Sequence, residues 1–245
     1  MASDALTTDE LGQLLLDAAG AGDAEQVAKL LETGAPLSWC RPDGWTALML
    51  AAEAGKSEVL SLLLDRGADA NARGKRGTPA LIAAARAGQA ATTALLLDHG
   101  ADLHCRTNAG WTALIAAAQE GHCDVVRLLL DRGSDLEAKN SGGGTALMLA
   151  AVEGHHDTAL LLLDRGAALQ ARAPVGWTPL MLAAREGHAD VARLLLRRGA
   201  DVEARRDNGE DAISVCDGDE CMRVLRDAEG LQRWLRRRCL ALWRH

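Results

Sequence analysis

The chain repeats itself with a period of 33 residues, and this restricts the folds open to it more than any other feature. The segment "GWTALMLAAEAGKSEVLSLLLDRGADANAR" at 44–73 returns as "GWTALIAAAQEGHCDVVRLLLDRGSDLEAK" at 110–139 and as "GWTPLMLAAREGHADVARLLLRRGADVEAR" at 176–205. Full units in one phase fill residues 41–205. A fixed period of this length is typical of repeat architectures, in which each unit is one small supersecondary structure.

Each unit is predicted to contain two short helices. A Thr stands before the first apolar run in four units and predicts a helix N-cap there: Thr46, Thr112, Thr145 and Thr178. Gly55 and Gly67, with their equivalents every 33 residues, predict the ends of the first and the second helix. In "KRGTPALIAAA", Thr78 and Pro79 stand one place early, so we expect that helix to gain a residue at its start.

The composition favours a core made of helices. The chain has no Phe and no Tyr, and its six Trp are the only aromatic residues. The core must therefore consist mainly of Leu and Ala, which suits closely packed helices better than a sandwich or barrel. A single helix pair is too thin to bury its apolar side, so neighbouring units are expected to stack and share one elongated core.

The charge and the chain start exclude several classes of protein. The net charge of −7 argues against a nucleic-acid binder. The start "MASDALTTDE" is not a signal peptide, and no apolar run approaches the roughly 20 residues of a membrane span. The six Cys form no CxxC pair and fit reduced thiols. We therefore expect a cytoplasmic, monomeric protein, with a nuclear location left open.

The repeat resembles the ankyrin repeat family. The period and the pattern T-P-L-x-x-A-A-x-x-G-H…L-L-x-x-G-A are both present. The resemblance implies an all-α helix-turn-helix solenoid with β-hairpin loops, of about seven repeats including caps. Its expected parts are a lead-in at 1–9, a repeat domain at 10–228 and a basic amphipathic helix at 229–245. The expected repeats lie near 10–40, 41–73, 74–106, 107–139, 140–172, 173–205 and 206–228.

No motif in the sequence indicates catalysis, a cofactor or a metal. His122, His155 and His188 occupy the same slot of successive units. Their spacing places them on separate layers about 10 Å apart, which is too far for one metal ion. No Ser or Cys has a base and an orienting acid at a recognisable spacing. The glycines stand at turns of the repeat and form no phosphate-binding loop.

The resemblance implies a binding surface in a concave groove, made of the hairpin tips and the exposed face of each first helix, where a partner protein would lie. Carried over position by position, this surface comprises Asp43, Trp45, Glu53, Lys75, Arg76, Arg86, Asn108, Trp111, Gln119, Glu120, Glu153, Trp177, Arg185 and Glu186. The expected function is that of an adaptor or scaffold without enzymatic activity, and the identity of the partner cannot be read from a fold.

Two features of this surface have alternative interpretations. Trp45, Trp111 and Trp177 share one slot in alternate units, either as exposed anchors for a partner or as packing for the next hairpin. Lys75, Arg76 and Arg86 form a basic patch, which is either scattered surface charge or part of the site.

The C-terminal segment also has two interpretations. Residues 222–245 carry a local excess of +5 in an acidic chain. A helical register puts Leu231, Trp234, Leu235 and Leu242 on one face and Arg233, Arg237 and Arg244 opposite, with Arg238 inside the apolar face. The helix is either a cap on the last repeat or a dock for an acidic partner or an anionic membrane surface. The second interpretation gives an alternative function, that of a targeting module.

Overall fold

The structure is a computed structural model that describes residues 6–242, and the side chains of residues 6–234. Over these residues the chain is helical apart from its loops, which confirms the predicted all-α class. The chain forms two compact units, Met1–Asp135 and Leu136–His245, called unit 1 and unit 2 below.

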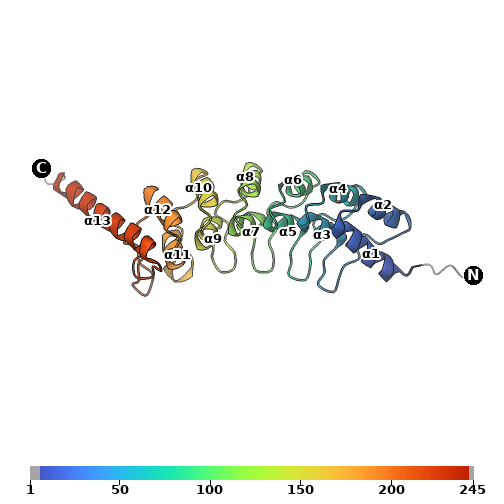
Figure 1. Ribbon diagram of the computed structural model, residues 1–245, viewed down its shortest axis with the longest axis horizontal. Coiled ribbons are helices and arrows are strands. Elements are labelled where there is room, and N and C mark those ends of the chain that lie inside the picture. Colours follow the sequence, from blue (N-terminus) through green and yellow to red (C-terminus); the bar gives the residue numbers. More distant parts are fainter. Residues whose placement is uncertain (1–5, 243–245) are drawn as a thin grey trace, which may run out of the picture. The chain divides into compact units, whose positions relative to one another are not determined.

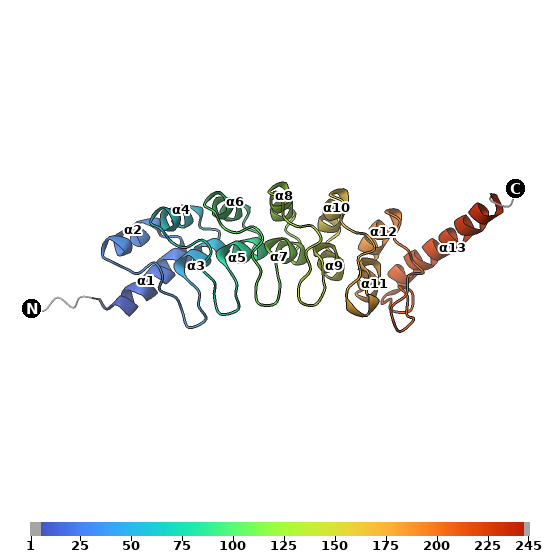
Figure 2. The same cartoon turned by 180° about the vertical axis from the view of Figure 1, so that it is seen from behind.

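Unit 1 consists of helix pairs. Its helices are α1 (Thr8–Ala21), α2 (Ala24–Glu32), α3 (Ala47–Glu53), α4 (Ser57–Asp65), α5 (Ala80–Arg86), α6 (Ala90–Asp98), α7 (Ala113–Gln119) and α8 (Cys123–Asp131). The first helices of the pairs, α1, α3, α5 and α7, pack on one another in a row, and the second helices form a parallel row (Figures 1 and 2). The loops between pairs project from the first row, on the side away from the second row.

Unit 2 repeats this arrangement and adds a long helix. It contains α9 (Ala146–Val152), α10 (His156–Asp164), a short 3₁₀ turn at Pro174–Gly176, α11 (Pro179–Arg185), α12 (Ala189–Arg197) and α13 (Asp219–Leu242). Helix α9 packs on α11, and α10 packs on α12. Helix α13 packs against α12, where a second helix of a further pair would otherwise lie.

The core follows the repeat. The recurring Leu of the first helices is at most 3% exposed in Leu48, Leu81 and Leu114, and the Ala pairs that follow it are fully buried. The same holds for Leu147 and Leu180 in unit 2. Because Ala is small, adjoining first helices can approach closely, and the Leu side chains fill the space between the two rows.

The predicted helix ends are confirmed. The hydroxyl oxygens of Thr46, Thr112, Thr145 and Thr178 each accept a hydrogen bond from the backbone N–H three residues later. This bond satisfies an N–H group that the helix itself cannot pair. Gly55 and its equivalents adopt positive φ angles, as predicted for the residue that ends the first helix.

The expectation that the helix after Thr78 and Pro79 gains a residue is wrong. Helix α5 begins at Ala80 and has seven residues, the same length as α3 and α7, so it gains no residue. Its N-cap is Pro79, which has no side-chain capping bond. The buried Leu81 and Ala84 must pack against the equivalent residues of α3 and α7. This packing sets the start of α5, whatever residue precedes it.

The loops between pairs are hairpins without true strands. Isolated β-bridges join Cys40 to Thr46 and Arg73 to Pro79, and residues 6–242 contain no longer ladder. Among the described helices, none is both long and apolar enough to cross a bilayer.

Candidate functional site

The hairpin tips of unit 1 are held in register by backbone hydrogen bonds. The N–H of Lys75 donates to the carbonyl oxygen of Asp43 at 3.0 Å, and the N–H of Asn108 donates to that of Arg76 at 3.0 Å. The side-chain amide of Asn108 also donates to the carbonyl oxygen of Lys75 at 3.3 Å. Asp43, Lys75, Arg76 and Asn108 therefore project exposed side chains from one ordered surface.

A basic side chain strengthens this register at the base of the hairpins. The guanidinium of Arg73 donates to the carbonyl oxygens of Gly77 and Arg106. In unit 2, Lys139 Nζ donates to the carbonyl oxygen of Arg172 at 3.1 Å, and Arg172 donates to that of Arg205 at 3.0 Å. The bond to Gly77 lies within one hairpin, and the other three links each span one repeat, so neighbouring hairpins are joined by contacts at equivalent positions.

The three Trp of the shared slot are all half-buried but have different surroundings. The guanidinium of Arg41 lies 5.8 Å from the centre of the Trp45 ring. Trp177 contacts two cations, with Arg185 at 4.9 Å and Arg206 at 3.8 Å from its ring centre. Such cation–π contacts hold the rings of Trp45 and Trp177 against other residues of the same chain.

A pocket of about 250 Å³ lies beside Trp111 in unit 1, and we call it the unit-1 pocket. It is lined by side chains from two neighbouring hairpins and from the first helices that follow them. Its main lining residues are Arg76, Ile82, Arg86, Trp111, Ala116 and Gln119. Four of the predicted site residues, Arg76, Arg86, Trp111 and Gln119, therefore meet in one hollow.

A second pocket, of about 390 Å³, occupies the equivalent position in unit 2, and we call it the unit-2 pocket. Its residues Gly142, Met148, Val152, Trp177, Leu182 and Arg185 stand 66 residues, or two repeats, after the six residues just named. Two of the predicted site residues, Trp177 and Arg185, line the unit-2 pocket. The repeat thus forms the same hollow twice, but only the unit-1 pocket has two Arg in the slots that Gly142 and Val152 fill.

The other predicted residues line neither pocket. Glu53, at the end of α3, forms an ion pair with Arg86 at 3.7 Å, and Glu186 forms one with Arg185 at 2.6 Å. Glu120 and Glu153 are exposed C-cap residues of α7 and α9, and they line neither pocket. Asp43 forms a local ion pair with Arg41 at 3.2 Å.

Sequence reasoning missed three kinds of residue at this surface. Ile82 and Ala116 line the unit-1 pocket, although both are buried core residues. Arg206 comes from the loop after α12 and covers Trp177, a contact that the repeat pattern does not encode. His122 and His188, which share one slot of the repeat, make a contact between repeats that their spacing did not predict.

Those histidines instead link neighbouring repeats. The ring Nε2 of His122 lies 3.0 Å from the carbonyl oxygen of Arg86, and that of His188 lies 2.9 Å from the carbonyl oxygen of Val152. A carbonyl only accepts, so each Nε2 carries the proton and donates. Arg86 and Val152 are the last residues of α5 and α9, and the His rings therefore satisfy carbonyls that these helices leave unpaired. Among the described residues no group of three or more His, Cys, Asp or Glu could hold a metal ion.

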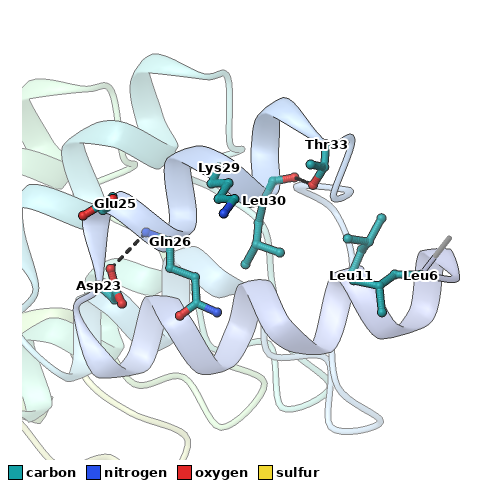
Figure 3. Close-up of a pocket in the computed structure, with 8 residues that line it drawn as sticks. All are labelled: Leu6, Leu11, Asp23, Glu25, Gln26, Lys29, Leu30 and Thr33. Carbon is teal, nitrogen blue, oxygen red and sulfur yellow. Dashed lines mark hydrogen bonds between the residues drawn. The ribbon is translucent and has the colours of Figure 1, made fainter. Parts of the chain in front are cut away.

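A further hollow, of about 770 Å³, lies at the N-terminal end of unit 1 (Figure 3). It is lined by Leu6, Leu11 and Leu30 together with polar residues of α2 such as Lys29 and Glu25. Leu6 is 51% exposed, whereas Leu30 is buried. No predicted site residue lies there, and its mixed lining indicates no particular ligand.

The first part of α13 packs on unit 2, as a cap would. Cys221 and Leu225 are buried, and Gln232 donates through Nε2 to the carbonyl oxygen of Ala200 at 2.8 Å. Leu231 and Trp234, by contrast, are 58% and 51% exposed. The side chains of the remaining tail residues named above, Leu235, Arg237, Arg238, Leu242 and Arg244, lie outside the described part of the chain.

The comparisons with known proteins agree with this geometry. A family model for ankyrin repeats in three copies matches residues 15–107, 66–140 and 137–206. The chain is similar to the crystal structure of the human ASB11 ankyrin repeat domain, with 25% identity and a TM-score of 0.79 over 87% of this chain and 96% of that one. It is also similar to the ankyrin repeat domain of Bcl-3, of the IkappaB protein family, with 28% identity and a TM-score of 0.73 over 87% and 97% of the two chains. No curated protein matches the sequence.

Proposed function

Because the chain belongs to the ankyrin repeat family, whose domains are generally non-catalytic modules for protein–protein interaction, we propose that it is an adaptor or scaffold that binds one partner protein through its hairpin tips and first helices. The observation that carries this proposal is the recurrence of one hollow, beside a Trp, at equivalent positions in both units. A partner that inserts side chains into such hollows gains well-packed contacts around a Trp, which are the contacts that dominate interface energies. The proposed location is the cytoplasm, since the six Cys of the chain suit a reducing compartment.

A site-specific photo-crosslinking experiment tests the surface. A photoreactive amino acid is placed at Ala109, an exposed residue of the unit-1 pocket, and in a matched chain at Glu58, an exposed residue of α4 in the second row. In a lysate, we expect a discrete adduct from position 109 and none of the same mass from position 58. The substitution Trp111→Ala should weaken the adduct. Adducts of equal yield from both positions, or from position 58 alone, would contradict the proposal.

A second candidate function, membrane targeting, is favoured by the exposure of Leu231 and Trp234 on α13. Its test is cosedimentation of the full chain with vesicles of phosphatidylserine and phosphatidylcholine, beside a chain that ends after Trp234. Binding by the full chain that is lost on truncation and at high salt supports targeting. Equal sedimentation of both chains excludes it.

A further inference from the structure

The segment that forms one wall of the unit-1 pocket is unusual for an acidic protein. Between Asp69 and Asp98 the chain carries Arg73, Lys75, Arg76 and Arg86 and no acidic residue, although the whole chain has a net charge of −7. The guanidinium of Arg73 is used at the base of the hairpin, where it binds backbone carbonyls. The other three cationic residues, Lys75, Arg76 and Arg86, are exposed at the surface.

The unit-1 pocket concentrates two of these cations beside an aromatic ring. Arg76 and Arg86 both line it, and both are exposed. Arg86 has one carboxylate nearby, that of Glu53 at 3.7 Å, which is longer than a hydrogen bond. Among the described residues, Arg76 forms no ion pair. The rest of the lining includes the half-buried ring of Trp111, together with Ile82 and Ala116, which are apolar and only 3% and 2% exposed.

The unit-2 pocket provides an internal comparison. At the positions of Arg76 and Arg86 it has Gly142 and Val152, so the hollow forms without either guanidinium. The two Arg are therefore not needed to build the pocket. Their effect is to give a preformed hollow a positive charge, and guanidinium groups bind carboxylates by charge-assisted hydrogen bonds of fixed geometry.

We propose that the unit-1 pocket binds an acidic side chain of an extended segment of the partner protein, with Arg76 and Arg86 contacting the carboxylate and Trp111 packing against the neighbouring apolar side chain. This inference rests on the proposed function and narrows it to a partner segment in which acidic and apolar residues alternate. An entering carboxylate replaces the long contact between Arg86 and Glu53.

The test uses fluorescence anisotropy with two labelled hexapeptides and the full chain. In one peptide Glu alternates with Leu, and in the other every Glu is replaced by Gln. We expect the Glu peptide to bind at least about tenfold more tightly, and the difference to shrink at 0.5 M NaCl, an ionic strength at which the screening length falls to about 4 Å. Arg76→Gln and Arg86→Gln should each weaken the Glu peptide about fivefold. The matched control Arg66→Gln, which removes an exposed Arg that follows α4 in the second row, should change it less than about twofold.

Three results overturn the inference. These are equal affinity for the two peptides, an equal loss with Arg66→Gln, and no saturable binding of the Glu peptide up to about 1 mM, which is the weakest affinity that a specific contact of this kind would give. Circular dichroism checks that each variant keeps its helices. If the peptide fails while Ala109 still forms its crosslink, only this inference is lost. If the peptide binds but the crosslink is absent, the proposed function is lost instead.

Discussion

The guanidinium carbon of Arg206 lies 3.8 Å from the centre of the Trp177 ring. Arg206 comes from the loop that follows α12, it is also paired with Glu210, and only 14% of its side chain is exposed. Trp177 is therefore covered by the next part of its own unit, as the packing interpretation of the Trp row requires. Trp111 occupies the same slot two repeats earlier, and both rings line a pocket, but among the described residues no cation lies over the Trp111 ring. One position of the repeat thus has two different surroundings.

This difference predicts unequal effects of removing the two Trp. Trp177→Ala loses two cation–π contacts and a half-buried ring, and we expect it to lower the free energy of unfolding by about 2 kcal/mol. Trp111→Ala should cost less than about 1 kcal/mol, because among the described residues no cation lies over its ring. Urea denaturation followed by circular dichroism measures both. If Trp111→Ala lowered the free energy of unfolding more than Trp177→Ala, the cation–π contacts would not explain the difference between the two substitutions.

The capping bonds predict that Thr→Ala substitutions in two neighbouring repeats destabilise the protein to different extents. Thr112→Ala removes the side-chain cap of α7, and the free energy of unfolding should fall by about 1 kcal/mol. Thr78→Ala should cost less than about half of that, because α5 has Pro79 at its N-cap and receives no side-chain bond. The midpoints of urea unfolding compare them. Equal losses would mean that Thr78 stabilises α5 by a route other than capping.

These two Thr also show how far the sequence predicts the fold. The period predicted the helix pairs, and the Thr caps and Gly ends placed their bounds correctly in most units. The local reading failed at α5, where Thr78 and Pro79 suggested an earlier start. The row of buried Leu and Ala sets the phase of each first helix, and a local signal that conflicts with it is overridden.

The candidate site was less accessible to sequence reasoning. The repeat indicated which positions face the hairpin side, but it did not indicate which side chains meet. Arg76 and Arg86 share a pocket with Trp111, which lies one repeat further on, whereas Glu120 and Glu153 stay outside the pockets. Arg206 covers Trp177, but the repeat does not predict an Arg there, since the residue one repeat earlier is Ala173. Contacts of this kind depend on side-chain directions across two repeats, and a position in the pattern does not specify them.

The His188 link predicts coupling to a glycine. A Cβ built at Gly154 would lie 2.6 Å from Nδ1 of the His188 ring, and Gly154 has a φ of 73°. His188→Ala should lower the free energy of unfolding by about 1 kcal/mol, since the carbonyl oxygen of Val152 loses its donor. Gly154→Ala should cost more in the parent chain than in the His188→Ala chain, where the ring no longer clashes. A double-mutant cycle measures the coupling, and strict additivity would contradict it.

The thiols predict an order of chemical reactivity. Burial raises the pKa of Cys221 from 9.0 to about 12 and that of Cys105 to about 11. Both thiols therefore stay protonated at pH 8, whereas alkylation requires the thiolate. Among the five Cys whose side chains the structure describes, iodoacetamide should modify the exposed Cys40 first, and Cys221 should react only on unfolding. Mass spectrometry of a time course gives the order.

The same shift predicts how stability depends on pH. The folded chain holds the Cys221 proton more tightly than the unfolded chain, so the contribution of Cys221 is complete below about pH 9 and is lost as the pH rises towards 12. Cys221→Ala should flatten this alkaline decline relative to the parent chain. A decline of the same slope in both chains would assign it to other groups.

The contacts of Gln232 predict where the capping role of α13 ends. Its side-chain amide donates to the carbonyl oxygen of Ala200 at 2.8 Å and accepts from the N–H of Val202 at 3.4 Å, which ties α13 to the loop after α12. A chain that ends after Ala228 loses both bonds and the ion pair of Arg233 with Glu203, and it should melt several degrees lower. A chain that ends after Trp234 keeps all three contacts and should melt close to the full chain. Gln232→Ala in the full chain should lower the free energy of unfolding by about 1 kcal/mol. Equal melting temperatures for the two truncations would show that residues 229–234 do not stabilise the last repeat.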